Sequence, residues 1–199
     1  MKRAASILLA LMLALSLTAC GGNGGSGGVR AEDGYGEGKI GDVMKSYFFD
    51  FTVNSAALQD AYESHTPDDG EKVLVVNVTV TNTFAQNTKM SKDDISAGNA
   101  DIEMYDTDFQ IEWDGDDEAV SIPITTDPET YEEFDPVSDN QLPAIYPLAH
   151  EETRTGDLVF DVPADVTDFV LCMEEWFDDG SEEGQAGDVY AVLFTPEAK

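Results

Sequence analysis

One segment of the chain alternates apolar and polar residues so regularly that it constrains the fold more than any other feature. Within Lys72–Asn82 the alternate residues form two sets: Leu74, Val76, Val78 and Val80 are aliphatic, whereas Asn77, Thr79 and Thr81 are polar. Successive side chains of a β-strand point to opposite faces, so each set would occupy one face. The segment therefore predicts a strand with one side in a core and the other in water.

The rest of the chain from about residue 44 consists of short apolar runs separated by Gly, Pro, Asn and Asp. No run carries a helical apolar stripe over three turns, although Ser55–Glu63 could form a short helical turn. Further strands are expected at Tyr47–Val53, Leu158–Val162, Ile102–Tyr105, Phe109–Trp113, Phe169–Trp176 and Val189–Phe194. An irregular edge strand is expected at Leu142–Leu148, because Pro143 and Pro147 cannot donate backbone hydrogen bonds. About eight strands favour an all-β fold, a two-sheet sandwich.

The N-terminus has the organisation of a bacterial lipoprotein signal peptide. Lys2 and Arg3 precede the apolar run Ile7–Leu15, which is too short to span a membrane. Leu17-Thr18-Ala19-Cys20 then resembles a lipobox. The resemblance implies cleavage before Cys20 and a diacylglycerol on its thiol, and two acyl chains anchor a protein stably. We therefore expect a protein on the outer face of the cytoplasmic membrane, held there by its lipid.

The predicted organisation has three parts: a signal peptide at 1–19, a lipid-anchored Gly-rich linker at 20–43, and one β-sandwich domain at 44–199. The linker prediction depends on ten glycines between Gly21 and Gly41 and on the absence of apolar periodicity there. As a flexible coil, these residues would have an r.m.s. reach of roughly 25 Å.

Charge and cysteine content exclude some classes of function. The formal net charge is −31, and it becomes −33 once Lys2 and Arg3 are removed with the signal peptide. Such a surface repels phosphate groups, so nucleic acid is excluded as a partner. Cys172 is the only cysteine besides Cys20, and its apolar surroundings predict a buried, inert thiol rather than a nucleophile.

Three stretches, Tyr47–Ala56, Gly70–Asn82 and Gly156–Pro163, together resemble the telokin-like, immunoglobulin-like extracellular domain of Gram-positive lipoproteins. That family is mostly of unknown function and is akin to a secreted immunoprotective mycobacterial antigen. The resemblance covers roughly residues 45–195 and implies an immunoglobulin-like sandwich without catalytic residues. Where the family has a Pro-Gly-Glu type of turn before the late strand, this chain has Pro147–Glu151 instead.

Motifs of catalysis are missing from the sequence. It has no Gly-x-Ser-x-Gly and no His-Glu-x-x-His, and its two histidines, His65 and His150, are expected in loops. The acids are too numerous for their spacing to indicate a catalytic pair. We therefore expect no enzyme, with an envelope enzyme as the least favoured alternative.

The acid-rich loops leave a calcium site as an open possibility. Asp114, Asp116 and Asp117 lie in one dense cluster and Asp178–Glu183 is another, but neither follows the EF-hand pattern. Solvated loops on an acidic surface are the favoured explanation of both clusters. The segment from Asp114 to Gln141 is long for a sandwich connection, and an extra hairpin at Val120–Thr125 would account for it.

Aromatic residues among the acids of this segment, Tyr131 and Phe134, could form a recognition surface for a cationic or carbohydrate partner. The favoured function is a non-catalytic interaction module of unknown ligand at the cell surface. Its partner would be a protein or a carbohydrate of the cell envelope. The alternative is a lipoprotein that captures a cation, such as calcium, or a small solute for transport or sensing.

Overall fold

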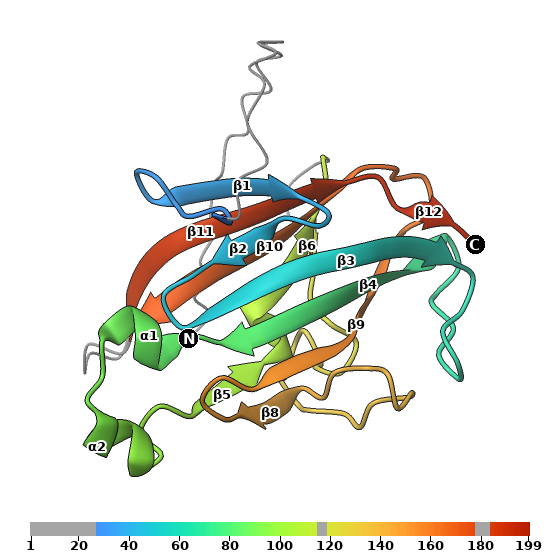
Figure 1. Ribbon diagram of the computed structural model, residues 1–199. Helices are drawn as coiled ribbons and strands as arrows, with labels where there is room; N and C mark the ends of the chain where they lie inside the picture. The colour runs from blue at the N-terminus through green and yellow to red at the C-terminus, as the bar shows by residue number, and fades with distance from the viewer. Residues whose placement is uncertain (1–26, 115–118, 178–183) are drawn as a thin grey trace.

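The strand predicted at Lys72–Asn82 forms as β4 (Glu71–Asn82), at the centre of one of two facing sheets (Figure 1). The computed structural model describes residues 27–114, 119–177 and 184–199. The sheet of β4 has the order β12-β3-β4-β9, and β2 also pairs with β3. Its other strands are β2 (Val43–Lys45), β3 (Phe49–Gln59), β9 (Thr153–Pro163) and β12 (Glu197–Ala198).

The facing sheet has the order β1-β11-β10-β6-β7, in which β1 runs parallel to β11. Its strands are β1 (Tyr35–Lys39), β6 (Phe109–Glu112), β7 (Val120–Ser121), β10 (Phe169–Phe177) and β11 (Gln185–Phe194). A two-stranded sheet adds β5 (Ile102–Tyr105) and β8 (Ile145–Leu148). The predicted all-β sandwich is confirmed, with twelve strands in the described residues instead of about eight.

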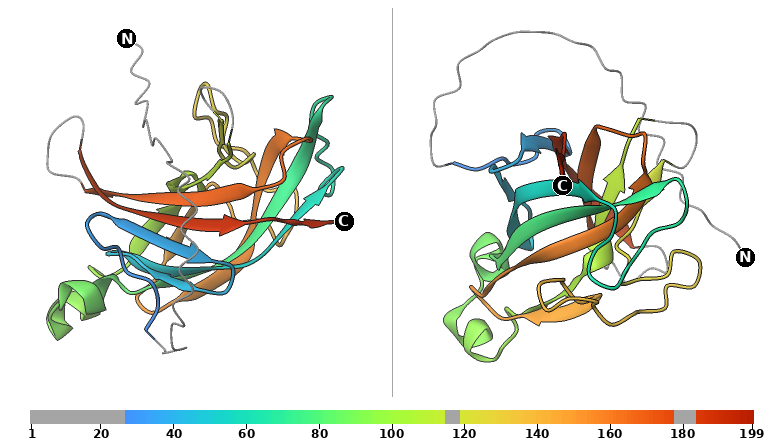
Figure 2. Two further views of the ribbon diagram at one scale, coloured as in Figure 1. Left: turned by 90° about the horizontal axis from the view of Figure 1, so that it is seen from above. Right: turned by 90° about the vertical axis from the view of Figure 1, so that its right-hand side faces the viewer.

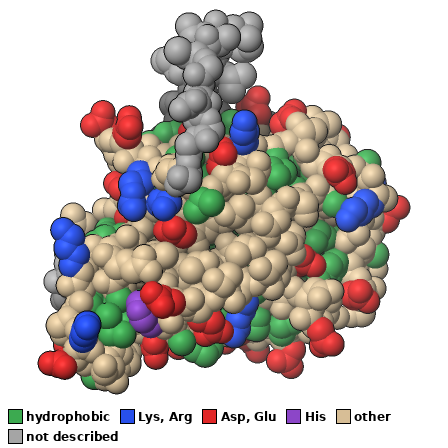
Figure 3. Space-filling model, viewed as in Figure 1, with side chains coloured by type: hydrophobic (Ala, Val, Ile, Leu, Met, Phe, Trp, Pro, Cys, Tyr) green, Lys and Arg blue, Asp and Glu red, His purple; other side chains and the backbone are tan. Residues whose placement is uncertain are grey.

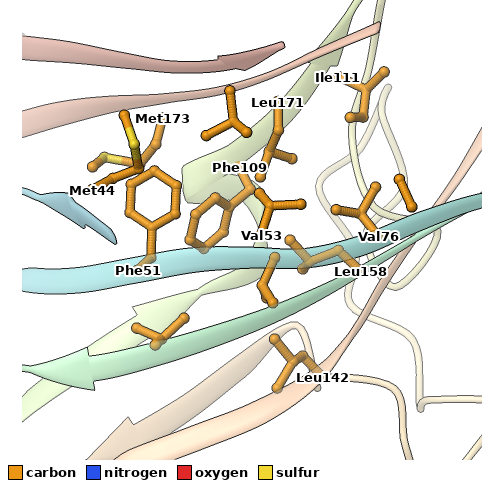
Figure 4. Packing of buried hydrophobic residues seen from close by; sticks show 14 of the residues in the cluster. Met44, Phe51, Val53, Val76, Phe109, Ile111, Leu142, Leu158, Leu171 and Met173 are labelled. Carbon is orange, nitrogen blue, oxygen red and sulfur yellow. The ribbon is translucent and has the colours of Figure 1, made fainter. Parts of the chain in front are cut away.

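The core lies between the two sheets and contains the residues that the alternation assigned to it. Val78 has an exposed fraction of 0%, whereas its neighbour Thr79 is partly exposed on the outer face. Phe51 and Val53 of β3 point toward Leu171 and Met173 of β10 (Figure 4). The burial of these apolar side chains is the main favourable contribution to folding.

The outer face of β3, β4 and β9 carries neutral polar side chains that bond to one another. Thr79 pairs with Thr155 and Thr81 with Thr153, at 2.8 and 2.9 Å between their hydroxyl oxygens. The middle of this face is largely without charged side chains, and the acids gather around it (Figure 3). The −31 charge is therefore distributed unevenly over the surface.

The linker predicted at residues 20–43 was too long. Described structure begins at residue 27, Val29 donates to the Val43 carbonyl at 2.7 Å, and β1 lies wholly inside the predicted linker. The sandwich therefore includes residues before the predicted boundary at residue 44. The part of the predicted linker before residue 27 and the signal peptide lie outside the described residues.

Two short helices follow β4, and the sequence pattern did not indicate either: α1 (Phe84–Thr88) and α2 (Lys92–Ser96). They lie at the end of the sandwich opposite the C-terminus (Figure 2). The helical turn considered within Ser55–Glu63 does not form, because β3 continues to Gln59 after a bulge between Val53 and Ser55. None of the helices in the described ranges is long and apolar enough to cross a membrane.

Candidate binding groove

A groove opens where β10 extends beyond its neighbour β6. Pairing between these strands ends at Met173 and Phe109, and from Glu174 to Phe177 β10 pairs only with β11. The side of the groove opposite this part of β10 is formed by residues of β5 and of the short 3-10 helix η1 (Asp106–Asp108). The resulting groove has a volume of about 280 Å³.

The floor of the groove is apolar and its rim is acidic and aromatic. Side chains of the floor come from the core: Phe48, Phe49, Ile102, Met104 and Met173. The rim is formed by Glu103, Tyr105, Asp108, Glu174 and Trp176, and the buried Glu175 lines the groove below them. Trp176 and Tyr105 have exposed fractions of 53% and 41%, so both rings are accessible from solvent.

Asp108 is largely removed from water, and Glu174 is partly buried. Burial raises the pKa of Asp108 to about 6, and within the described residues its carboxylate accepts one long hydrogen bond, of 3.3 Å, from the Tyr105 backbone N–H. Burial also raises the pKa of Glu174, whose carboxylate has no hydrogen-bond or ion-pair partner within the described residues. Removing a carboxylate from water without a compensating charge costs free energy. The groove therefore presents negative charge that the described residues do not neutralise.

Glu175 differs from its neighbours because it is buried and bonded. Its carboxylate accepts the backbone N–H of Tyr47 at 2.6 Å and that of Asp188 at 3.4 Å. A Cβ at Gly187 would lie 2.8 Å from the Glu175 Cβ, so the glycine leaves the space that this carboxylate needs. The β10–β11 pairing shifts by one residue between Glu174 and Trp176, a bulge of the kind that re-aims side chains beside binding sites. Glu175 therefore links β10, on one side of the groove, to the backbone at Tyr47 and Asp188.

A second buried acid, Asp106, fixes η1 to the segment that follows β7. It has an exposed fraction of 1% and accepts hydrogen bonds from the hydroxyls of Thr125 and Thr126. Burial is the main reason that its pKa rises to about 6. This contact holds one wall of the groove in place.

Aromatic rings pack together where the chain enters β3, next to the groove. Tyr47 and Phe48 each lie 5.3 Å from Phe177, between ring centroids, and Phe48 stacks on Phe84 at 5.6 Å. Ring pairs at these separations add stabilisation beyond area burial. The cluster rigidifies the end of β10 that carries Trp176.

A second hollow, of about 320 Å³, lies on the outer face of the other sheet beside Tyr62. Its polar groups already bond to one another. Asp157 accepts the Tyr62 hydroxyl at 3.0 Å on one carboxylate oxygen and the Asn77 amide at 2.7 Å on the other. Because its central carboxylate is satisfied, this hollow is a weaker candidate than the groove.

The structure describes only one of the residues predicted as lipid or metal sites. Cys20, Asp116 and Asp117 are outside the described residues, and Asp114 lies two residues after the end of β6 at Glu112. In the described parts of the chain, no three or more His, Cys, Asp or Glu side chains form a group that could hold a metal ion. The proposed calcium ligands therefore stay a prediction.

The aromatic residues predicted as a recognition surface are exposed, Tyr131 at 71% and Phe134 at 47%. The hairpin considered at Val120–Thr125 is wrong, because Val120 and Ser121 pair with β6. The chain instead turns between Thr126 and Glu133, which form an isolated bridge. This turn accounts for part of the length of the connection.

The remaining predicted residues are placed as follows. Cys172 is buried and in no disulfide, and burial raises its pKa, in agreement with an inert thiol. His65 lies with its Nε2 2.8 Å from an Asp161 carboxylate oxygen, and His150 lies in the turn before β9.

Sequence reasoning missed the groove residues Asp108, Glu174 and Trp176. One signal was available in the sequence. Trp176 follows two glutamates and occupies an outward-facing position of a strand, where a large aromatic ring cannot pack into the core.

A family model, described as a domain of unknown function (DUF4352), matches residues 38–182. Among curated proteins, none shows significant similarity to the chain.

Three solved structures are similar in fold. The proposed lipoprotein ycdA of Bacillus subtilis has 17% identity and a TM-score of 0.46, over 75% of this chain and 38% of its own length. The yjhA protein of Bacillus subtilis has 15% identity and a TM-score of 0.44, over 80% of this chain and 99% of its own. An uncharacterized β-sandwich protein from Clostridium difficile has 18% identity and a TM-score of 0.39, over 80% and 93%.

Proposed function

The chain belongs to the DUF4352 family of domains of unknown function, and we propose that its sandwich is a non-catalytic binding module, lipid-anchored at the cell surface, that holds its partner in the groove beside Trp176. The observation that carries this proposal is the combination of an apolar floor with carboxylates that have no cationic partner. Carboxylates without a cationic partner beside apolar core side chains are costly, and a binding site gives a reason for keeping them there.

The sandwich is further proposed to be of the immunoglobulin-like, telokin-like type. In an immunoglobulin domain, strands A, B, E and D form one sheet and C, F and G the other. If β3, β4 and β9 are A, B and E, and β6, β10 and β11 are C, F and G, the observed orders become A-B-E and G-F-C. The pair β5–β8 then corresponds to additions before C and before E. This correspondence supports the proposal.

Anchoring on the outer face of the cytoplasmic membrane is proposed from the sequence of residues 1–20. The lipid attaches to the Cys20 thiol, so Cys20→Ala should abolish fatty-acid labelling and leave unprocessed precursor in cells that express the full chain. Equal labelling of the variant and the natural protein would refute anchoring. This experiment is independent of the groove.

The groove is tested by crosslinking the full-length protein on intact cells. A partner held beside Trp176 should give a crosslinked product that Trp176→Ala loses. Tyr131→Ala is the matched control, because it also removes an exposed aromatic ring but lies outside the groove. Loss of the product in both variants, or in neither, would reject the groove as the binding site. Thermal melts of both variants check that they fold.

A further inference from the structure

The chemistry of the groove narrows its ligand. Its floor consists of the apolar side chains Phe48, Phe49, Ile102, Met104 and Met173. An aliphatic stem would be buried against these side chains, and methionines adapt to its shape. A volume of about 280 Å³ is just below the roughly 300–1,000 Å³ of sites for drug-sized ligands, so one side chain fits the groove better than a large solute.

The rim selects a positive charge. None of the ion pairs within the described residues involves Glu103, Asp108 or Glu174, so no basic side chain in those residues neutralises them. A cation between Asp108 and Glu174 would replace the water that these carboxylates lose on burial. The exposed face of Trp176 would add a cation–π contact. The charge of the whole chain would speed the approach of a basic partner.

The strand edge beside the groove selects a peptide rather than a free amine. Past Met173 no strand in the described residues pairs with β10 on the side of β6. An extended segment of a partner can add to such an edge through backbone hydrogen bonds while one of its side chains enters the groove.

We infer that the groove binds an extended segment of a partner protein, with a lysine or arginine side chain lying on the apolar floor and its charge between Asp108 and Glu174. This inference rests on the groove being the binding site, as proposed above. It adds the chemical class of the ligand.

The test uses the detergent-solubilised full chain and Trp176 fluorescence. The chain has two tryptophans, Trp113 and Trp176, so Trp113→Phe leaves Trp176 as the only reporter. Two synthetic peptides of sequence acetyl-Thr-Val-X-Val-Thr-amide carry lysine or the uncharged isostere norleucine at X. The lysine peptide should bind at least tenfold more tightly than the norleucine peptide.

Glu174→Gln keeps the shape of the side chain and removes its charge, and it should weaken binding of the lysine peptide at least tenfold without changing that of the norleucine peptide. Glu132→Gln, on an exposed turn outside the groove, is the matched control and should change neither.

Equal affinity for both peptides, or an unchanged affinity of Glu174→Gln for the lysine peptide, would overturn the inference. Binding of N-acetyl-lysine methylamide as tight as that of the peptide would overturn the peptide assignment in favour of small-solute capture. If the peptides fail to bind as predicted but the Trp176-dependent crosslink still forms on cells, only the proposed ligand class is rejected. If the peptide-binding and crosslinking experiments both fail, the groove is rejected as the binding site.

Discussion

Asp106 allows a measurement of how strongly one buried carboxylate opposes folding. With an exposed fraction of 1%, it has a pKa raised from 3.8 to about 6, so the shift corresponds to about 3 kcal/mol at 1.36 kcal/mol per pH unit. A folded-state pKa above the unfolded value means that the contribution to stability is complete below pH 3.8 and is lost as the pH rises through 6. The natural protein should thus lose about 3 kcal/mol of unfolding free energy through this group between about pH 4 and pH 7.5.

The Asp106→Asn variant isolates this effect, because an amide cannot ionise and its oxygen can still accept the Thr125 hydroxyl. Any cost of placing the NH₂ group is independent of pH. Urea unfolding at constant ionic strength from pH 4 to pH 8 gives the natural-minus-variant difference in unfolding free energy. This subtraction cancels the other carboxylates, and the difference should fall by about 3 kcal/mol.

Asp127→Asn is the control of opposite sign. Backbone N–H groups of Thr130 and Glu129 bond to the Asp127 carboxylate and lower its pKa. The corresponding difference should therefore be almost level above about pH 5 and should fall as the pH drops below the ordinary value of 3.8, so this control is followed down to about pH 2.5. A flat or rising difference for Asp106→Asn would refute the argument that burial dominates the titration of Asp106.

Three further predictions concern the core and the surface charge. Val78→Asp should destabilise the domain by more than about 3 kcal/mol, because it buries an unpaired charge. Thr79→Asp, on the outer face, should cost less than about 1 kcal/mol, and equal effects of the two variants in thermal melts would contradict the strand register. Melting temperature should rise with added sodium chloride, because salt screens the repulsion among the acids; a fall would show that repulsion does not limit stability. Calcium at fixed ionic strength should give no saturable heat in calorimetry, and saturable binding lost in the triple variant with Asn at Asp114, Asp116 and Asp117 would instead support a metal site.

The strands were predictable where one face is buried and the other is wet. β4 has this property along most of its length and β9 has it on either side of its centre, whereas the central residues of β9 and β10 are buried on both faces. Two-residue periodicity is a local signal, so it is visible in the sequence without any knowledge of the partner strands. The same signal placed Val78 and Thr79 on their correct sides.

β1 was not predictable, because its glycines have a role that composition hides. A Cβ at Gly38 would lie 2.6 Å from the Met44 sulfur, and one at Gly36 would lie 3.0 Å from the Tyr190 ring. These glycines allow close approach of two chain segments, but in the sequence they look like the glycines of a linker. Parallel pairing with β11 joins residues about 150 positions apart, which no local pattern records.

The groove was also hidden from the sequence, because it results from a difference in length between two strands. β6 ends its pairing at Phe109 while β10 continues to Phe177, and the register that creates this offset is a long-range property. Trp176 alone gave a local hint. Fold prediction therefore succeeded further than site prediction.

The bond between Val29 and Val43 has a mechanical consequence if the chain is anchored through Cys20. Tension from the membrane would reach residue 27 first, and then the hydrogen bonds that Val29 makes with Val43 and Lys45. The opened segment 27–34 would span up to about 29 Å, at up to about 3.6 Å per residue. Because β1 lies at the edge of its sheet (Figure 1), it could peel from β11 next while β3, β4 and β9 stay paired. The N-terminal segment would then lengthen under load, and the groove would keep its structure until this segment is fully extended.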